Sequence, residues 1–159
     1  MSPSSFRPFR LAALASHPIQ YHAPLFRYLA SLPEIDLQVF FCSRRGSSPS
    51  WDPGFQRKVQ WDVPLLEGYP HRFLSQGSTG IALELCRGQF NAVWIHGWAT
   101  MAPWMAWAVA SCLHTPILLR GETNDLMVSS GLKGQIRQCF LRVLFSRVAG
   151  FLAIGIQAY

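Results

Sequence analysis

Three short polar segments follow apolar runs of the sequence and contain the side chains best suited to chemistry. They are His17–His22, His96–Trp98 and Arg120–Asp125. An imidazole with a pKa near 6.5 donates to or accepts from hydroxyl groups. The planar guanidinium of arginine pairs with phosphates and carboxylates. Together the three segments favour contact with a substrate that carries hydroxyl and phosphate groups.

His96 is the leading catalytic candidate in the second segment. It ends an apolar run and precedes Gly97, which lets a backbone or a ligand approach closely. A structural histidine in a turn is the alternative. Trp98 either stacks on a sugar ring or belongs to the core. We therefore include His96, Gly97 and Trp98 in the predicted site.

The third segment offers a charged pair. Glu122 would orient an acceptor while Arg120 offsets phosphate charge; alternatively, the two form a salt bridge that holds the turn. Asp125 either joins the site or caps a helix. We assign Glu122 a catalytic role and predict that Arg120 and Asp125 bind substrate.

The first segment supplies predicted substrate-binding residues. His17 either contacts substrate hydroxyls or a diphosphate, or braces the loop; Gln20 and Tyr21 are assigned to the same site. For Gln20 and His22 the structural alternative is the stronger one. His22 is expected near the start of a helix, where backbone N–H groups receive an anion.

Apolar runs and helical spacing alternate along the chain and define the elements that position these segments. Strands are predicted at residues 11–15, 37–42, 69–74, 92–95, 116–119 and 151–154. Helices are predicted at residues 24–32, 79–90, 101–113 and 136–148, and residues 43–64 are predicted to form a long irregular loop.

The strand–helix alternation predicts an α/β domain over residues 1–159. Its strands lack period-two alternation, as in parallel strands buried on both faces, so we expect a Rossmann-like parallel sheet with helices on both faces. In such sheets the ligand crevice lies at the carboxyl ends of the strands. The three polar segments are therefore expected to share one crevice.

Composition excludes several classes of protein. An apolar fraction of 50% against a charged fraction of 14% argues against disorder. The net charge of +6 comes mostly from scattered arginines, so nucleic-acid binding is not predicted. Residues 98–119 are too interrupted by polar residues and prolines to span a membrane, and no signal peptide is recognised.

The four cysteines are Cys42, Cys86, Cys112 and Cys139, and none forms a Cys-x-x-Cys pair. They are interpreted as reduced, buried thiols of a cytosolic protein, with no metal site. No Gly-x-Gly-x-x-Gly or P-loop pattern occurs, which argues against a dinucleotide oxidoreductase. No cofactor is predicted.

Several segments together resemble the N-terminal half of the retaining glycosyltransferases of family four (group 1). The similarity covers nearly the whole chain in the expected order. Its segments are His17–Phe26, Gly54-Phe55, Trp61–Tyr69, His96–Trp98, Leu119–Glu122 and Leu152–Gly155.

The resemblance implies one half of a GT-B fold, in which an N-terminal domain binds the acceptor. The domain that holds most of the nucleotide-sugar donor, with its Glu-x7-Glu motif, is absent from this sequence. By position His96 looks like the acceptor-site histidine of the family. The glycine pair that many relatives have in the first loop is replaced here by His17-Pro18-Ile19-Gln20.

The implied reaction moves a sugar from a nucleotide-sugar donor to a saccharide or lipid-linked acceptor, in polysaccharide or glycoconjugate biosynthesis. This chain alone is expected to be inactive. It is expected in the cytoplasm, with peripheral contact at the inner face of the membrane. The alternative is a non-catalytic membrane-surface or assembly module, suggested by the apolar helix at residues 101–113 and the positive charge.

Overall fold

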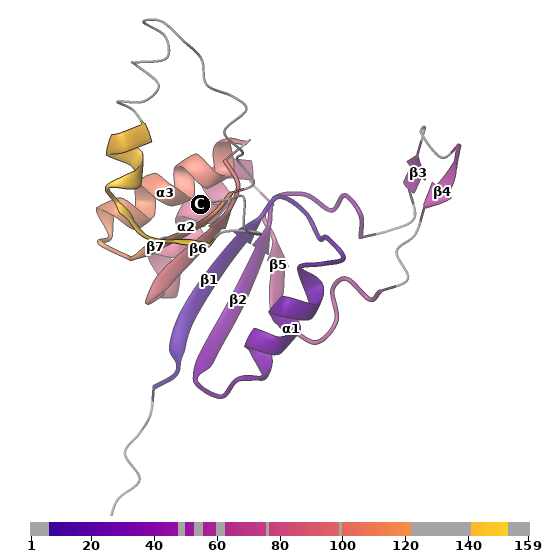
Figure 1. Cartoon of the computed structure of the whole chain (residues 1–159), viewed down its shortest axis with the longest axis horizontal. Coiled ribbons are helices and arrows are strands. Elements are labelled where there is room, and N and C mark those ends of the chain that lie inside the picture. Colours follow the sequence, from indigo (N-terminus) through magenta and orange to yellow (C-terminus); the bar gives the residue numbers. More distant parts are fainter. Residues whose placement is uncertain are drawn as a thin grey trace, which may run out of the picture.

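A parallel sheet forms the centre of the molecule. The computed structural model describes residues 7–47, 50–52, 56–59, 63–75, 77–98, 100–121 and 141–152. Within these residues six strands follow the order β5-β2-β1-β6-β7-β8, and every neighbouring pair is parallel (Figure 1). Taken in chain order this is 3-2-1-4-5-6, the strand order of Rossmann domains. The strands are β1 Phe9–Ala15, β2 Ile35–Phe41, β5 His71–Phe73, β6 Ala92–His96, β7 Ile117–Arg120 and β8 Val148–Leu152.

Helices cover both faces of the sheet, as predicted. They are α1 Ala23–Ser31, α2 Gly77–Gly88 and α3 Met101–Cys112. Successive residues of β1 point to opposite faces. Ala13 belongs to the core cluster of Phe26 on α1, whereas Leu14 belongs to the cluster of Ile81 on α2 and Ala106 on α3. The sheet is therefore buried on both sides, which explains its apolar strands.

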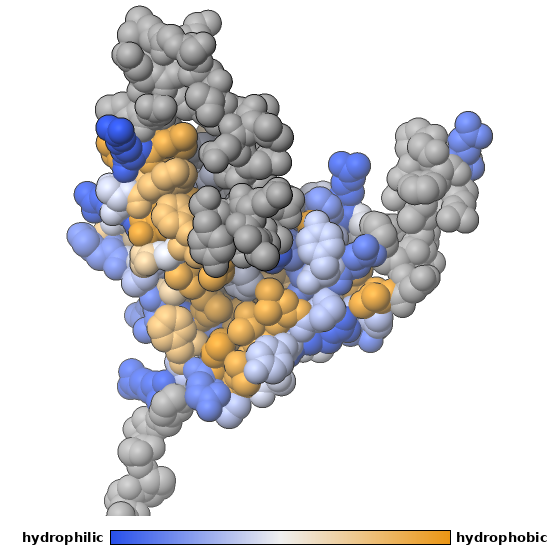
Figure 2. Space-filling model, in the orientation of Figure 1, coloured by the Kyte–Doolittle hydropathy of each residue, from blue (hydrophilic) through white to orange (hydrophobic). Residues whose placement is uncertain are grey.

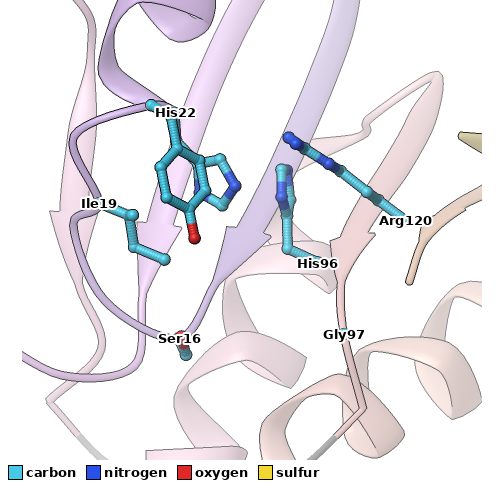
Figure 3. A pocket seen from close by; sticks show the side chains of 7 residues that line it. Ser16, Ile19, His22, His96, Gly97 and Arg120 are labelled. Atoms are coloured by element: carbon cyan, nitrogen blue, oxygen red, sulfur yellow. The ribbon is translucent and has the colours of Figure 1, made fainter. Parts of the chain in front are cut away.

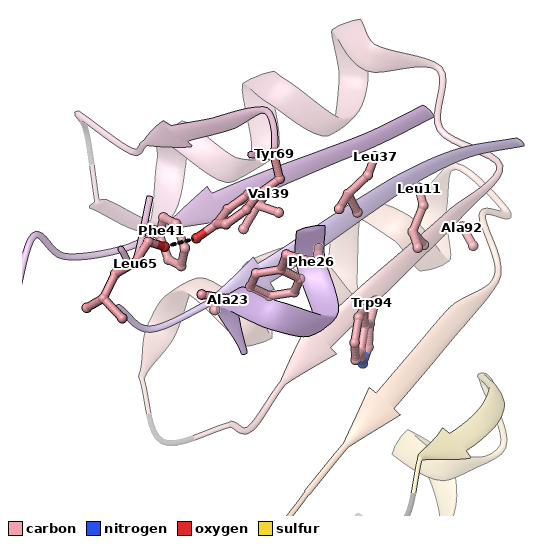
Figure 4. Packing of buried hydrophobic residues seen from close by; sticks show 12 residues of the cluster. Leu11, Ala23, Phe26, Leu37, Val39, Phe41, Leu65, Tyr69, Ala92 and Trp94 are labelled. Atoms are coloured by element: carbon pink, nitrogen blue, oxygen red, sulfur yellow. Dashed lines mark hydrogen bonds between the residues drawn. The ribbon is translucent and has the colours of Figure 1, made fainter. Parts of the chain in front are cut away.

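Phe26 is the centre of the core beneath α1. Its side chain is fully buried, and its ring lies 5.3 Å from that of Tyr69, 5.9 Å from Trp94 and 6.4 Å from Phe41, measured between centroids (Figure 4). The Tyr69 hydroxyl donates a hydrogen bond to the Leu65 carbonyl. These contacts attach α1 and the segment before β5 to the same face of the sheet.

Small residues let α3 lie close to the other face. Ala102, Ala106 and Ala110 are spaced four residues apart and are all buried, so they form one stripe of the helix. Met101, at the start of α3, is 68% exposed. The helix is thus buried along one stripe and not on all sides, although its sequence is apolar all round.

Two predicted elements differ from the structure. The segment predicted as an irregular loop contains a two-stranded antiparallel ribbon, β3 Ser50–Asp52 and β4 Arg57–Val59. Residues 141–145 are helical, but Val148, assigned to that helix from the sequence, is the first residue of β8 and pairs with Ile117. Parallel pairing with β7 outweighs the helical spacing there.

The prediction of buried cysteines is wrong at two positions. Cys86 and Cys112 are exposed, because both lie at the solvent side of the last turn of a helix. Cys42 is partly buried, and burial raises the pKa of its thiol. Cys139 lies outside the described residues.

Apolar side chains are exposed beside the last strand. Val143 is 60% exposed, Phe151 57% and Leu152 39%. Figure 2 shows apolar surface on the side of the molecule where β8 forms the edge of the sheet. In the described part of the chain, no helix is long and apolar enough to cross a bilayer.

Replacing Phe26 by alanine should lower the free energy of unfolding by about 3–5 kcal/mol, because it leaves a cavity under α1. Tyr28→Ala is the matched control, since Tyr28 lies on the same helix and is 63% exposed. It should change the free energy by no more than about 0.5 kcal/mol. Urea denaturation followed by circular dichroism measures both. Equal effects of the two substitutions would contradict this account of the core.

Candidate functional site

A pocket lies at the carboxyl ends of β1, β6 and β7. This is where the strand order reverses, because β1 pairs with β2 on one side and β6 on the other. Open parallel sheets bind ligands at such a point. The cavity has a volume of about 240 Å³ and is lined by Ser16, Ile19, Tyr21, His22, His96, Gly97 and Arg120 (Figure 3).

Strand register places two of these residues side by side. His96 is the last residue of β6, Arg120 is the last of β7, and the two are direct partners across the parallel pair. The N–H of Gly97 then donates to the Arg120 carbonyl at 2.8 Å, which continues the pairing by one bond. Figure 3 shows the guanidinium group of Arg120 beside the His96 ring.

The backbone conformation at position 97, and not a lack of space, favours glycine there. Its φ is +72°, in the left-handed region, and a Cβ atom built there would meet nothing within 4 Å. The space beside Gly97 is therefore open to the pocket that it lines. This agrees with the expectation that the glycine lets a ligand approach closely.

The His96 ring is packed among aromatic side chains. Its centroid lies 4.2 Å from Trp94, 4.6 Å from His22 and 5.7 Å from Phe26. Neither ring nitrogen has a hydrogen-bond partner among the described residues. Buried polar atoms are usually paired, so an unpaired imidazole lining a cavity points to a group supplied by a ligand.

His22 lies opposite and is more deeply buried. Only 6% of it is exposed, and its Nδ1 has no partner within the described chain. It is the residue before α1, where its carbonyl accepts from Phe26 N at 2.9 Å and its N–H donates to the Ile19 carbonyl at 3.0 Å. The turn and the helix therefore fix the ring against His96, as Figure 3 shows.

Both imidazoles are held in the neutral form. Burial lowers the pKa of His96 to about 2, with further contributions from His22 and Arg120. Burial lowers the pKa of His22 to about 4, and Arg120 and His17 add to the effect. At pH 7 the positive charge lining the pocket therefore comes from Arg120.

Of the other predicted residues of the first segment, Tyr21 lines the pocket, whereas His17 and Gln20 do not. Tyr21 lines the pocket at its mouth, where it is 57% exposed and its ring meets His22 edge-on at 5.0 Å. His17 does not line the pocket; its Nδ1 lies 2.9 Å from the Ser16 hydroxyl. Gln20 is exposed and is also outside the lining.

Trp98 faces a different, apolar hollow. Its ring lies 6.1 Å from Phe145, and its carbonyl accepts a hydrogen bond from Trp104 Nε1 at 3.0 Å. Gly97 is the one residue common to the linings of this hollow and of the polar pocket. The structure thus places Trp98 with the core, the alternative that the sequence left open.

Glu122 and Asp125 lie outside the described residues, so their predicted roles stay predictions. Two lining residues, Ser16 and Ile19, were not predicted from the sequence, and His22 was expected to be mainly structural. Ser16 directly follows the predicted strand at residues 11–15, and this position could have indicated it. Among the described residues, no group of three His, Cys, Asp or Glu side chains is arranged to hold a metal ion.

Comparisons with known proteins support the fold. No protein-family model and no curated protein matches the sequence. Among solved structures, a UDP-N-acetylglucosamine 2-epimerase is similar, with a TM-score of 0.55 and 14% identity, over 96% of this chain and 43% of the other. MurG of Acinetobacter baumannii gives a TM-score of 0.49 and 10% identity over the same shares.

The chain therefore spans less than half the length of either structure. At 14% identity the likeness to the epimerase shows the fold alone. It confirms the predicted class, a Rossmann-like α/β domain of the kind that forms one half of a GT-B protein. Membership of glycosyltransferase family four stays a prediction.

The neutral histidines should make the protein less stable in acid. Their pKa values in the unfolded chain are near 6.5. The unfolded state therefore takes up protons between pH 6.5 and 4 that the folded state does not. Above about pH 6.5 this difference in proton uptake costs no stability. As the pH drops below 6.5, the free energy of unfolding falls by about 1.4 kcal/mol per pH unit for each such histidine.

His96→Phe should reduce this pH dependence while keeping an aromatic ring in place. Trp94→Phe is the control, because it alters the neighbouring packing and retains the imidazole. Urea denaturation at several pH values between 4 and 7 gives the slopes. An unchanged slope in His96→Phe would show that His96 is not held neutral by the fold.

Proposed function

We propose that this chain forms the acceptor-side domain of a GT-B glycosyltransferase, which moves a sugar from a nucleotide-sugar donor to a saccharide or lipid-linked acceptor. The observation that carries the proposal is the contact of two neutral histidines beside Arg120 in the crevice where the strand order reverses. Both ring nitrogens of His96 and the Nδ1 of His22 have no hydrogen-bond partner among the described residues. The fold neighbour is named for a UDP-sugar, which supports a nucleotide sugar as donor.

Neutral imidazoles suit sugar hydroxyls. Each has one N–H donor and one acceptor nitrogen, and a hydroxyl group both donates and accepts. His96 offers two free nitrogens to the ligand and His22 offers its Nδ1. Since the aromatic neighbours fix the His96 ring, it would hold an acceptor hydroxyl in one orientation.

The low pKa of His96 determines what the residue contributes. Its imidazole is a weak proton acceptor at pH 7. Its part is therefore to align the attacking oxygen with the anomeric carbon, and Arg120 supplies a positive charge beside it in the pocket. Retention of configuration is implied by the resemblance alone.

Tyr21 replaces Trp98 as the aromatic residue of the proposed site. Its exposed ring stands at the pocket mouth and is steadied by the edge contact with His22. A sugar ring has an apolar face that packs on such a surface. We include Tyr21, His22, His96, Gly97 and Arg120 in the proposed acceptor site, with Ser16 at its edge.

A non-catalytic binding module is the second candidate. The exposed apolar residues Val143, Phe151 and Leu152 favour it, together with the net charge of +6. Such a surface would place the protein at an anionic membrane or against a partner chain. Sedimentation with vesicles that contain about 30% anionic lipid, at low and high salt, would detect binding to a membrane. Attraction between the basic protein and the anionic lipid should weaken at high salt. Binding lost in Phe151→Ser would favour this module.

A saccharide titration tests the proposed site. N-acetylglucosamine or glucose added to the 159-residue chain should shift the backbone amide resonances of Ser16, His22, His96 and Gly97 in a ¹H–¹⁵N correlation spectrum. His96→Ala should weaken binding by about tenfold, because two hydrogen-bonding atoms are lost.

Glu34→Ala is the control for this titration. Glu34 is exposed and lies before β2, at the opposite end of the sheet, so its removal should leave the affinity unchanged. Shifts confined to residues outside the pocket, or equal affinity in His96→Ala and the unaltered chain, would remove the pocket from the proposed function.

A further inference from the structure

The backbone of the turn after β1 offers little to a phosphate group. Pro18 and Pro24 have no N–H, and the N–H groups of His22 and Ala23 both bond to the Ile19 carbonyl, at 3.0 and 3.3 Å. Loops that cradle a diphosphate bring backbone N–H groups to it through glycines, and this turn has none. Direct hydrogen bonds to an anion in the pocket are therefore expected mainly from side chains.

Arg120 is the side chain placed to recognise it. It lines the pocket next to His96, and within the described residues it forms no salt bridge. Among the described residues, none that lines the cavity carries a carboxylate. A guanidinium group without an internal partner matches one carboxylate or one phosphate in a bidentate arrangement.

His22 and α1 favour a negative group at the same place. His22 is only 6% exposed, and its Nδ1 has no partner among the described residues. It lines the cavity and directly precedes α1. The first turn of α1 has no acidic residue, so nothing on the helix offsets the positive end of its dipole. Arg120, His22 and the helix end thus form one site of positive potential.

We propose that the pocket binds a saccharide that has a single anionic substituent, a carboxylate or a phosphate monoester. Arg120 pairs with the anion, and His22 and His96 hydrogen-bond the neighbouring hydroxyls. This rests on the proposed function and narrows its acceptor to an acidic sugar. The volume of about 240 Å³ is below the roughly 300–1,000 Å³ of pockets for drug-sized ligands, and suits one sugar unit.

Electrostatics around the histidines agree with an anionic ligand. The positive charge of Arg120 contributes to the lowered pKa of both His22 and His96. A bound anion would oppose that charge and raise both pKa values. A carboxylate stays ionised over this range, so glucuronate should bind more tightly as the pH falls from 7 to 5, which a neutral sugar would not show.

Calorimetric titration of the 159-residue chain with five probes tests this: glucose, glucuronate, glucose 6-phosphate, UDP and inorganic phosphate. Glucuronate and glucose 6-phosphate should bind at least about tenfold more tightly than glucose, because an ionised partner strengthens the hydrogen bonds. Their advantage should shrink at 0.5 M salt. Inorganic phosphate is the fifth probe and should bind more weakly than glucose 6-phosphate.

Arg120→Gln should remove the preference for the two acidic sugars over glucose, so that all three sugars bind with similar affinity. Arg87→Gln is the matched control, since Arg87 is exposed on α2 and outside the pocket. Circular dichroism verifies that each variant is folded. If Arg120→Gln does not fold, Arg120→Lys and the salt dependence of glucuronate binding to the unaltered chain decide.

Each contrary outcome has a distinct meaning. Equal affinity for glucose and the acidic sugars would overturn the acidic acceptor and leave the saccharide site standing. Tighter binding of UDP than of any sugar, lost in Arg120→Gln, would assign Arg120 to a diphosphate and overturn the proposal. Inorganic phosphate binding as well as glucose 6-phosphate would show that no sugar is recognised. Failure of every saccharide to bind would overturn the proposed function as well.

Discussion

Parallel pairing of β1, β6 and β7 is the constraint on which the site depends. It ends three strands at one edge of the sheet, and its register makes His96 and Arg120 direct neighbours. Because β1 pairs with β2 on its other side, the following turn passes over the reversal of strand order and brings His22 to the same place. A slip of one residue in β6 would turn His96 to the face covered by α3.

Burial gives the pocket its chemical character at a cost in stability. Two imidazoles lie with ring centroids 4.6 Å apart and close to a guanidinium, and the His96 ring packs against Trp94 and Phe26. Burial disfavours the charged form of both rings, and the nearby positive charge of Arg120 adds to the effect, so both stay neutral. Three of their nitrogens, both of His96 and the Nδ1 of His22, have no partner among the described residues. Unpaired polar atoms destabilise a fold by about 1–3 kcal/mol each, and a ligand that bonds them recovers that loss.

The sequence predicts the architecture better than it predicts the pocket lining. Apolar runs and strand–helix alternation are sufficient for the parallel sheet, because each strand is buried on both faces. Which way a residue faces after a strand ends depends on the turn that follows. The left-handed Gly97 separates His96 from Trp98, and the hydrogen bonds to the Ile19 carbonyl fix His22. Neither effect leaves a periodic signal in the sequence. The pairing of Val148 with Ile117 is likewise a contact between distant residues, which helical spacing in the sequence does not indicate.

Nuclear magnetic resonance of the histidine side chains tests the central claim most directly. In the ligand-free chain at pH 6, the account predicts a nuclear Overhauser contact between the rings of His22 and His96. It also predicts nitrogen shifts typical of neutral imidazole for both residues. Protonated nitrogen shifts at this pH, without any contact between the two rings, would contradict the convergence of the three strand ends on one site that holds both imidazoles neutral.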